Sequence, residues 1–330
     1  MRDPRIPSQE VVDTLAAELE AQPAILRTLA ERWESPDPSI QDLMTRRHRR
    51  VALVALGSSR DAALVGQWLL RSRGVDATVH MPSEDLEPLA REALVIAVSA
   101  SGATGDIAEA IDRLARRRPV IAVTREPGSP VAALADVVVP LGCEPERSGI
   151  AVWSFLATIA ALSALSELMT GGSTASVAAS LRDAAPLLAE MRASQAASIE
   201  RFAERLREAS MVHIVAPMSR LGPALQAAQV LREVPRLNVV AVAAEDWDHS
   251  HAYLTVDAGY LAVVSGPTSA DAELRRWVVG RGRGLLSLGQ PIVEDGPGLT
   301  MPDDPRLRVL VECPLMESIA LRAWAMLSSP

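Results

Sequence analysis

Residues 94–104 have the sequence LVIAVSASGAT, in which five apolar residues run directly into a loop of small hydroxyl residues around one glycine. A helical pattern begins soon afterwards, from about residue 106 to residue 117. A short, continuous apolar run that leads into a polar turn and a helix is typical of a strand buried on both faces of a parallel sheet. The stretch therefore predicts a strand at 94–98 and an α/β fold around it.

Strand and helix patterns alternate on both sides of this stretch. Apolar runs bounded by turn residues predict further strands at 51–56, 77–81, 120–123 and 137–139. Helical spacing of apolar residues predicts helices over 9–33, 61–72, 150–169 and 178–209. Strands that alternate with helices of this length form parallel sheets with helices on both faces, and we expect that arrangement here.

The pattern then repeats in the second half of the chain. Ser59-Arg60 recurs as Ser219-Arg220, and Glu84-Asp85 recurs as Glu245-Asp246 at nearly the same distance. The second half has predicted strands at 211–216, 239–243, 260–264, 284–288 and 307–312, and a last helix at 316–326. We infer two related α/β domains, and we predict a helical segment at 1–34, a first domain at 35–190 and a second at 191–330.

Composition excludes several classes of partner. The chain has 330 residues, a formal net charge of −8 and 3% aromatic residues, so we expect no nucleic-acid partner. The basic run at 46–50 is short and lacks interleaved aromatic residues, which favours a solvated helix end over a nucleic-acid arm. Cys143 and Cys313 stand far apart and match no zinc spacing, so we expect buried thiols, no metal and no cofactor. No signal peptide or membrane-spanning run is evident, and we expect a cytoplasmic protein without a membrane partner.

Three hydroxyl side chains make the loop after the 94–98 strand a candidate anion site. Ligands of open parallel sheets bind beyond the carboxyl ends of the strands, which is where Ser99, Ser101 and Thr104 stand. A helix N-terminus offers N–H donors and a positive dipole end, and Gly102 lets the backbone approach a ligand closely. One capping residue would be enough to start a helix. The three hydroxyls, with a second pair at Ser58 and Ser59, favour a phosphate site that needs neither Lys nor Mg²⁺.

Four segments carry a resemblance to a known family. They are 18–23 (ELEAQP), 57–59 (GSS), 99–104 (SASGAT) and 146–148 (ERS). The first half resembles the sugar isomerase (SIS) domain family, and the whole chain is similar to the tandem-SIS isomerase portion of glucosamine-6-phosphate synthase and to stand-alone amino-sugar isomerase and deaminase relatives. The most specific match is 99–104, which follows the family's Ser-x-Ser-Gly-x-Thr pattern.

The resemblance implies a fold, an assembly and a ligand. Each half is expected to form a flavodoxin-like three-layer α/β/α domain with a parallel sheet, and the protein is expected to be a homodimer with composite active sites. The expected ligand is a small-molecule sugar phosphate. The residues that the resemblance assigns to its binding are Ser58, Ser59, Ser99, Ser101, Thr104 and Glu146.

The same resemblance supplies two candidate catalytic residues in the second half. Glu233 stands in a Leu-Arg-Glu context and corresponds to the family's catalytic base, and His249 corresponds to its ring-opening histidine. An ordinary exposed glutamate at a helix end is an equally good interpretation of Glu233. Residues 245–251 contain three acids and two histidines, so a metal site built on Asp246, Asp248, His249 and His251 is a competing hypothesis, which we rank below acid–base chemistry because its spacing matches no metal motif. A solvated loop is a further alternative for Asp248 and His251.

The chain also departs from the family pattern. Val152 and Trp153 replace the Thr and Lys of the Glu-x-Ser segment, and the family's lysine-bearing tail does not follow the last helix. The chain contains no lysine, so a Schiff base through a lysine side chain is excluded. We therefore expect an aldose–ketose isomerase that acts on a sugar or amino-sugar phosphate through an enediol. The alternatives are altered chemistry on the same fold, such as amino-sugar phosphate deamination or a step on a specialised metabolite, and a non-catalytic phosphosugar sensor.

Overall fold

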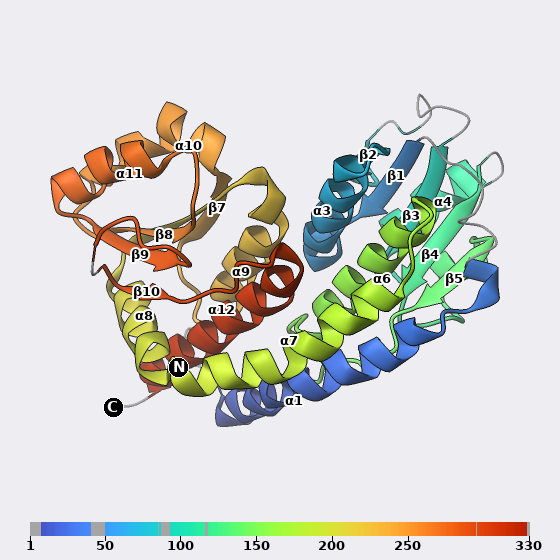
Figure 1. The fold of residues 1–330 in the computed structure, drawn as a ribbon, viewed down its shortest axis with the longest axis horizontal. Coiled ribbons are helices and arrows are strands. Elements are labelled where there is room, and N and C mark those ends of the chain that lie inside the picture. The colour runs from blue at the N-terminus through green and yellow to red at the C-terminus, as the bar shows by residue number, and fades with distance from the viewer. Residues whose placement is uncertain are drawn as a thin grey trace. The chain divides into compact units, whose positions relative to one another are not determined.

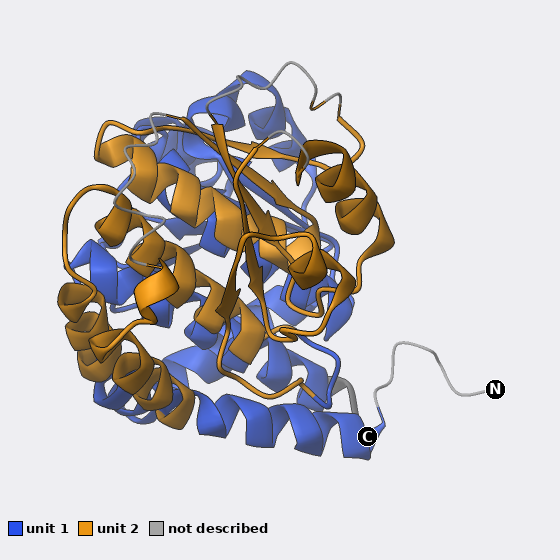
Figure 2. Ribbon diagram, turned by 90° about the vertical axis from the view of Figure 1, so that its right-hand side faces the viewer, with its two compact units in different colours: residues 1–23, 147–150, 184–330 blue, residues 24–146, 151–183 orange. Residues whose placement is uncertain are grey.

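The structure is a computed structural model, and it describes residues 8–40, 50–84, 86, 93–115, 118–294 and 296–328 (Figure 1). The chain divides into two units (Figure 2). Unit 1 comprises residues 1–23, 147–150 and 184–330, and unit 2 comprises 24–146 and 151–183. Helices α1 (Gln9–Glu34) and α7 (Ala175–Ser194) contribute residues to both units, so the domain boundaries expected from the sequence stay a prediction.

Unit 2 contains a five-stranded sheet in which all strand pairs are parallel. Its order is β2-β1-β3-β4-β5. The strands are β1 (Arg50–Ala55), β2 (Asp76–His80), β3 (Ala93–Val98), β4 (Val120–Thr124) and β5 (Val137–Pro140). Every residue of β3 and β4 is buried, which explains why these strands have continuous apolar runs instead of alternating ones.

Helices cover both faces of this sheet. Alternate strand residues point to opposite faces. Val54 belongs to a core cluster with residues of α4 (Gly105–Ala115) and α5 (Pro130–Ala133). Its neighbour Leu53 faces Gly66 of α3 (Gly57–Ser72), which in turn lies against Leu162 of α6 (Trp153–Met169). The predicted three-layer arrangement with a parallel sheet is confirmed in this unit.

Unit 1 repeats the topology with a second parallel sheet. Its order is β7-β6-β8-β9-β10, the same crossover pattern as in unit 2. The strands are β6 (Met211–Ala216), β7 (Val239–Ala243), β8 (Tyr260–Ser265), β9 (Gly284–Leu288) and β10 (Gly298–Leu299). Its helices are α8 (Ala196–Glu208), α9 (Leu221–Glu233), α10 (Ala244–Ser250), α11 (Asp271–Trp277) and α12 (Pro305–Ser328), with 3₁₀ turns η1 (Met218–Arg220), η2 (His251–Val256) and η3 (Val279–Arg281). No helix within the described ranges has the length and apolar character that crossing a bilayer requires.

The predicted strand at 307–312 is wrong, because this segment lies in helix α12. Its apolar residues look strand-like, yet Arg308 and Glu312 form an ion pair at helical i,i+4 spacing with an N–O distance of 2.7 Å. A helix-start signal was present just before it. Asp304 accepts a hydrogen bond from the backbone N–H of Arg306, and Pro305 stands at the first helical position. The fifth strand of this sheet is the short β10 instead.

A chain of buried polar side chains crosses the core of unit 1. Trp247 Nε1 donates to Tyr260 Oη at 3.0 Å, and Tyr260 Oη lies 3.1 Å from Nδ1 of His213. All three residues are buried. Burial raises the pKa of Tyr260, so its phenol stays protonated and can donate to His213.

Substituting Tyr260→Phe should lower the free energy of unfolding by about 1–3 kcal/mol, because it leaves two buried polar groups without their partner. The measurement is urea denaturation followed by circular dichroism. Tyr253→Phe is the matched control: Tyr253 is exposed, so its substitution should change stability by no more than about 0.5 kcal/mol. Equal effects of the two substitutions would show that the buried chain does not contribute to stability.

Candidate functional site

The loop after β3 is closed by its own hydroxyl groups. Ser99 Oγ accepts a hydrogen bond from the N–H of Gly102 at 3.1 Å and lies 3.3 Å from Thr104 Oγ1. Ser101 Oγ accepts from the N–H of Ala103 at 3.3 Å, and Ser101 is exposed. Ser99 is only 2% exposed, so it forms the floor of the loop, while Ser101 faces solvent. The structure thus brings the three predicted residues Ser99, Ser101 and Thr104 together at the start of α4.

Gly102 is required by the shape of this loop. Its φ is +63°, and a Cβ placed there would lie 2.0 Å from Ser129 Oγ and 2.8 Å from Thr124 Oγ1. Its carbonyl accepts from the N–H of Val131 at 3.1 Å, which ties the loop to α5. A larger residue would therefore displace the loop from its neighbours.

The second predicted segment leaves the neighbouring strand at the same edge of the sheet. In the pairing of β1 with β3, Ala55 lies opposite Val98. The chain leaves β1 through Gly57, whose φ is +54°, and Ser58 and Ser59 stand in the first turn of α3, half-buried. Two helices therefore begin where adjacent parallel strands end, and their N-terminal dipoles favour an anion there.

Arg125 is a candidate residue that the sequence analysis missed. It follows β4, and its backbone N–H donates to the carbonyl of Ala100 at 2.9 Å, which places it against the hydroxyl loop. Its guanidinium lies 3.4 Å from Glu146 Oε2 and 3.5 Å from Glu126 Oε1. The signal was its position directly after a predicted strand, at the carboxyl edge where ligands bind.

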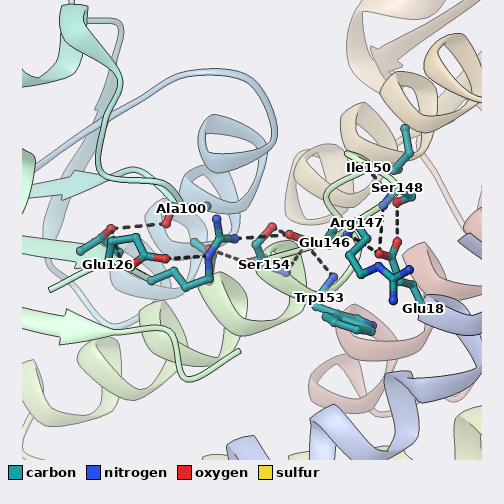
Figure 3. Close-up of polar contacts among 12 residues, drawn as sticks. Glu18, Ala100, Glu126, Glu146, Arg147, Ser148, Ile150, Trp153 and Ser154 are labelled. Carbon is teal, nitrogen blue, oxygen red and sulfur yellow. Dashed lines mark hydrogen bonds and ion pairs between the residues drawn. The ribbon is translucent and has the colours of Figure 1, made fainter. Parts of the chain in front are cut away.

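Glu146 lies at the N-terminus of α6 (Figure 3). Oε1 accepts from the N–H of Trp153 at 3.1 Å, and from the N–H and hydroxyl of Ser154 at 2.7 Å and 2.6 Å. Its side chain is 7% exposed. These contacts are those of a helix-capping carboxylate that is also paired with Arg125. The position of Glu146 therefore indicates that it fixes the N-terminus of α6 and the Arg125 side chain. Its predicted contact with substrate stays a prediction.

A second buried carboxylate holds the next residues of the chain. Glu18 of α1 accepts from the N–H groups of Arg147, at 2.5 Å, and Ser148, at 3.0 Å, and from the Ser148 hydroxyl (Figure 3). Glu18 is buried. The segment 18–23 that carried part of the resemblance therefore fixes the backbone of 147–148.

The two predicted catalytic residues stand on the surface of unit 1. Glu233 is the last residue of α9, is exposed, and accepts from Nε2 of Gln229 at 2.9 Å. His249 lies on α10 with a side chain that is 76% exposed, 3.9 Å from Asp248. The alternative of a solvated loop for Asp248 and His251 does not hold, since Asp248 lies in α10 and His251 begins η2. Within the described part of the chain no three His, Cys, Asp or Glu side chains are grouped to hold a metal ion, including those at 245–251.

His251, not His249, contacts the buried polar chain. Its ring packs edge-on against His213 with 5.0 Å between centroids. Burial, and to a smaller extent His251, lowers the pKa of His213 from 6.5 to about 4. His213 is therefore neutral at physiological pH.

Cys143 is a buried thiol, as the sequence predicted. Burial, and next the charge of Glu146, raises its pKa to about 12. It is therefore protonated at neutral pH and is no nucleophile for this site. Cys313 is likewise buried and free.

Comparison with known proteins places this site in a family context. The family model of the SIS domain matches residues 44–168, which contain both hydroxyl segments. Over 290 residues the chain is 30% identical to glutamine–fructose-6-phosphate aminotransferase (isomerizing) from Symbiobacterium thermophilum, which covers 84% of this chain and 46% of that relative. The chain therefore spans about half the length of this curated relative.

Solved structures share the fold over nearly the whole chain. Tagatose-6-phosphate ketose/aldose isomerase from Escherichia coli has a TM-score of 0.75 and 15% identity, with 96% of this chain and 94% of that chain covered. Glucosamine-6-phosphate deaminase from Thermotoga maritima has a TM-score of 0.74 and 17% identity, with 95% and 94% covered. At this identity the likeness shows a common fold, with two parallel five-stranded sheets.

The substitution Gly102→Ala should lower the free energy of unfolding by about 1–3 kcal/mol, because the added Cβ meets Ser129 at a left-handed backbone position. Gly105→Ala is the matched control. Gly105 begins α4, and a Cβ there meets nothing within 4 Å, so this change should be neutral or stabilise by up to about 1 kcal/mol. Urea denaturation of both variants measures the difference, and an equal response would refute the steric constraint at Gly102.

The lowered pKa of His213 also predicts a pH dependence of stability. Unfolding returns His213 to its ordinary pKa, so between pH 6.5 and about 4 the unfolded chain binds a proton that the folded chain does not. This contribution is complete above pH 6.5 and is lost as the pH falls. Unfolding in urea should show a loss of about 1–1.5 kcal/mol from this residue between pH 7.5 and 5.5. His213→Gln should remove that part of the pH dependence and His249→Gln should keep it; the reverse pattern would contradict the assignment.

Proposed function

The chain carries a domain of the SIS family in residues 44–168, and on that premise we propose that it binds a sugar phosphate and isomerises it. The phosphate group is held by the hydroxyl loop 99–104 and by Ser58 and Ser59. The substrate is an aldose or ketose phosphate, or an amino-sugar phosphate. The protein acts in the cytoplasm as a homodimer whose active sites are composite.

The observation that carries this proposal is the architecture of the hydroxyl loop. Ser99, Gly102 and Thr104 are held in one closed turn where a helix of 11 residues begins. Hydroxyl and backbone N–H groups are neutral donors, and the helix dipole adds a partial positive charge. Such a site binds a phosphate group without metal or lysine, and lysine is absent from this chain.

The chemistry requires a base and an acid. In the open-chain aldose, Glu233 removes the proton from C2 and the electrons form a C1–C2 enediolate with its charge on O1. A proton passes from O2 to O1, and the proton that Glu233 holds returns to C1, which gives the ketose. His249 transfers the proton that opens the sugar ring. Both residues are exposed: Glu233 accepts a hydrogen bond from Gln229, and His249 lies near Asp248. In this proposal they reach the substrate only when the ligand is bound and the dimer is assembled.

A second SIS domain in the second half is part of this proposal. It is supported by the shared crossover order of the two sheets and by the recurrence of Ser59-Arg60 as Ser219-Arg220. It is supported further by the solved structures that cover both sheets.

A non-catalytic phosphosugar sensor is the second candidate. The specific observation in its favour is that Glu233 and His249 are both exposed on the surface of unit 1. Altered chemistry on the same fold, such as amino-sugar phosphate deamination, shares the phosphate site. There the same proton transfer gives an enolamine, whose imine tautomer is hydrolysed by water to the ketose and ammonia.

Proton exchange at C2 separates these candidates. The protein is incubated in D₂O with a panel of hexose, pentose and amino-sugar phosphates, and loss of the C2 proton signal is followed by NMR. We expect exchange with at least one compound, and a reduction of about 10²–10⁴-fold in Glu233→Gln. Glu204→Gln, an exposed glutamate on α8, is the matched control and should exchange at the wild-type rate.

Binding is measured in parallel by calorimetry with Thr104→Val. Binding that this variant loses, without exchange by the wild type, would reject the isomerase and favour the sensor. Exchange accompanied by release of ammonia from an amino-sugar phosphate would identify a deaminase. Exchange that survives in Glu233→Gln would remove Glu233 from the mechanism.

A further inference from the structure

A cluster of charged side chains lies at the carboxyl ends of the strands in the second sheet. We call this place the exit of the second sheet, and the proposed isomerisation does not use it. In the order β7-β6-β8-β9-β10, the chain crosses from one side of the sheet to the other between β6 and β8. This switch point is where open parallel sheets bind ligands. Arg220 follows β6 in η1, and Ser265 ends β8.

Arg220 is fixed against the end of β8. Its Nε donates to Ser265 Oγ at 2.8 Å, and its Nη2 donates to the carbonyls of Ser265, at 2.6 Å, and Pro267, at 3.3 Å. The residue is half-buried, so one edge of its guanidinium organises the turn while the residue still reaches solvent.

Arg308 brings a second guanidinium to the same serine. Its Nη2 donates to Ser265 Oγ at 3.3 Å and to the carbonyl of Leu288 at 2.7 Å, and its Nε donates to Glu312 at 2.7 Å. Gly289 makes room for it, because a Cβ there would lie 2.9 Å from Arg308 Nη1. The Ser265 hydroxyl donates to the other oxygen of Glu312.

The charges of this cluster do not balance. Two guanidinium groups share one carboxylate, and Arg308 and Glu312 are both less than 10% exposed. Burial, and next the charge of Arg308, lowers the pKa of Arg220, and Glu312 only partly offsets this. An excess positive charge held in a half-buried place is costly unless an anion reaches it.

We propose that the cluster of Arg220, Arg308, Ser265 and Glu312 is a second anion site, which binds a phosphate group at the exit of the second sheet. A planar guanidinium group can donate two parallel hydrogen bonds to two oxygens of one phosphate group. Glu312 and Ser265 hold the guanidinium groups of Arg220 and Arg308 in place before the ligand binds. The site lies wholly within unit 1 and does not depend on the hydroxyl loop of unit 2.

Calorimetry with inorganic phosphate tests the site in the Thr104→Val background, which weakens the contribution of the hydroxyl loop. Thr104→Val alone should still bind phosphate. Adding Arg220→Gln should weaken that binding at least about tenfold, since it removes one charged hydrogen-bonding partner. Adding Arg232→Gln instead is the matched control: Arg232 lies on α9 and donates to the carbonyl of Val239, outside the cluster, so binding should be unchanged.

Fructose 6-phosphate in the same background identifies the source of the phosphate group. Affinity equal to that of inorganic phosphate identifies free phosphate as the ligand, and tighter binding identifies a phosphorylated sugar. Absence of phosphate binding by Thr104→Val, or equal binding with and without Arg220→Gln, would overturn the proposal. These results are independent of C2 exchange, so the second site and the isomerase proposal fail separately.

Circular dichroism establishes that each variant is folded. If the variant with Arg220→Gln does not fold, Arg220→Lys takes its place, since it keeps the charge and loses the fork. Weaker phosphate binding by Arg220→Lys supports the site, and wild-type affinity contradicts it.

Discussion

The pairing of β1 with β3 is the contact on which the candidate site depends. Because Ala55 lies opposite Val98 in parallel register, the two strands end together and both chains turn into helices at one edge of the sheet. That geometry places the two serine-bearing turns at the same edge of the sheet. Every residue of β3 and β4 is buried, so the loop that follows β3 starts from a strand covered on both faces.

Most of the fold could be predicted because it rests on local patterns. Nine of the strands predicted from apolar runs coincide with observed strands to within about two residues. The segment at 307–312 could not be recognised from the run alone, because a short apolar run is compatible with a buried strand and with a buried helix. The capping pair Asp304-Pro305 would have decided it.

The site was predicted less completely, since its polar contacts join residues that are distant in sequence. The Ser99–Thr104 loop is local, and its pattern was sufficient to find it. Arg125 acts through a backbone bond to Ala100 and through Glu146, contacts that only the folded sheet creates. The contact of His251 with His213 likewise joins the 3₁₀ turn η2 to strand β6, so the local spacing of residues 245–251 does not reveal it.

The two sheets share one crossover order and end in different chemistry, which shows why fold alone does not assign function. The first switch point presents hydroxyls and N–H groups, which are neutral donors, and the proposed phosphate site there acts through dipoles. The second presents guanidinium groups held by Ser265 and Glu312, which bind through full charge. A substrate that must leave after each turnover suits the neutral site, because weak uniform binding does not trap the product. The charged site suits an anion that stays bound and stabilises the protein, or one whose concentration the protein senses. The same topology can therefore support turnover of a substrate at one sheet and retention of an anion at the other.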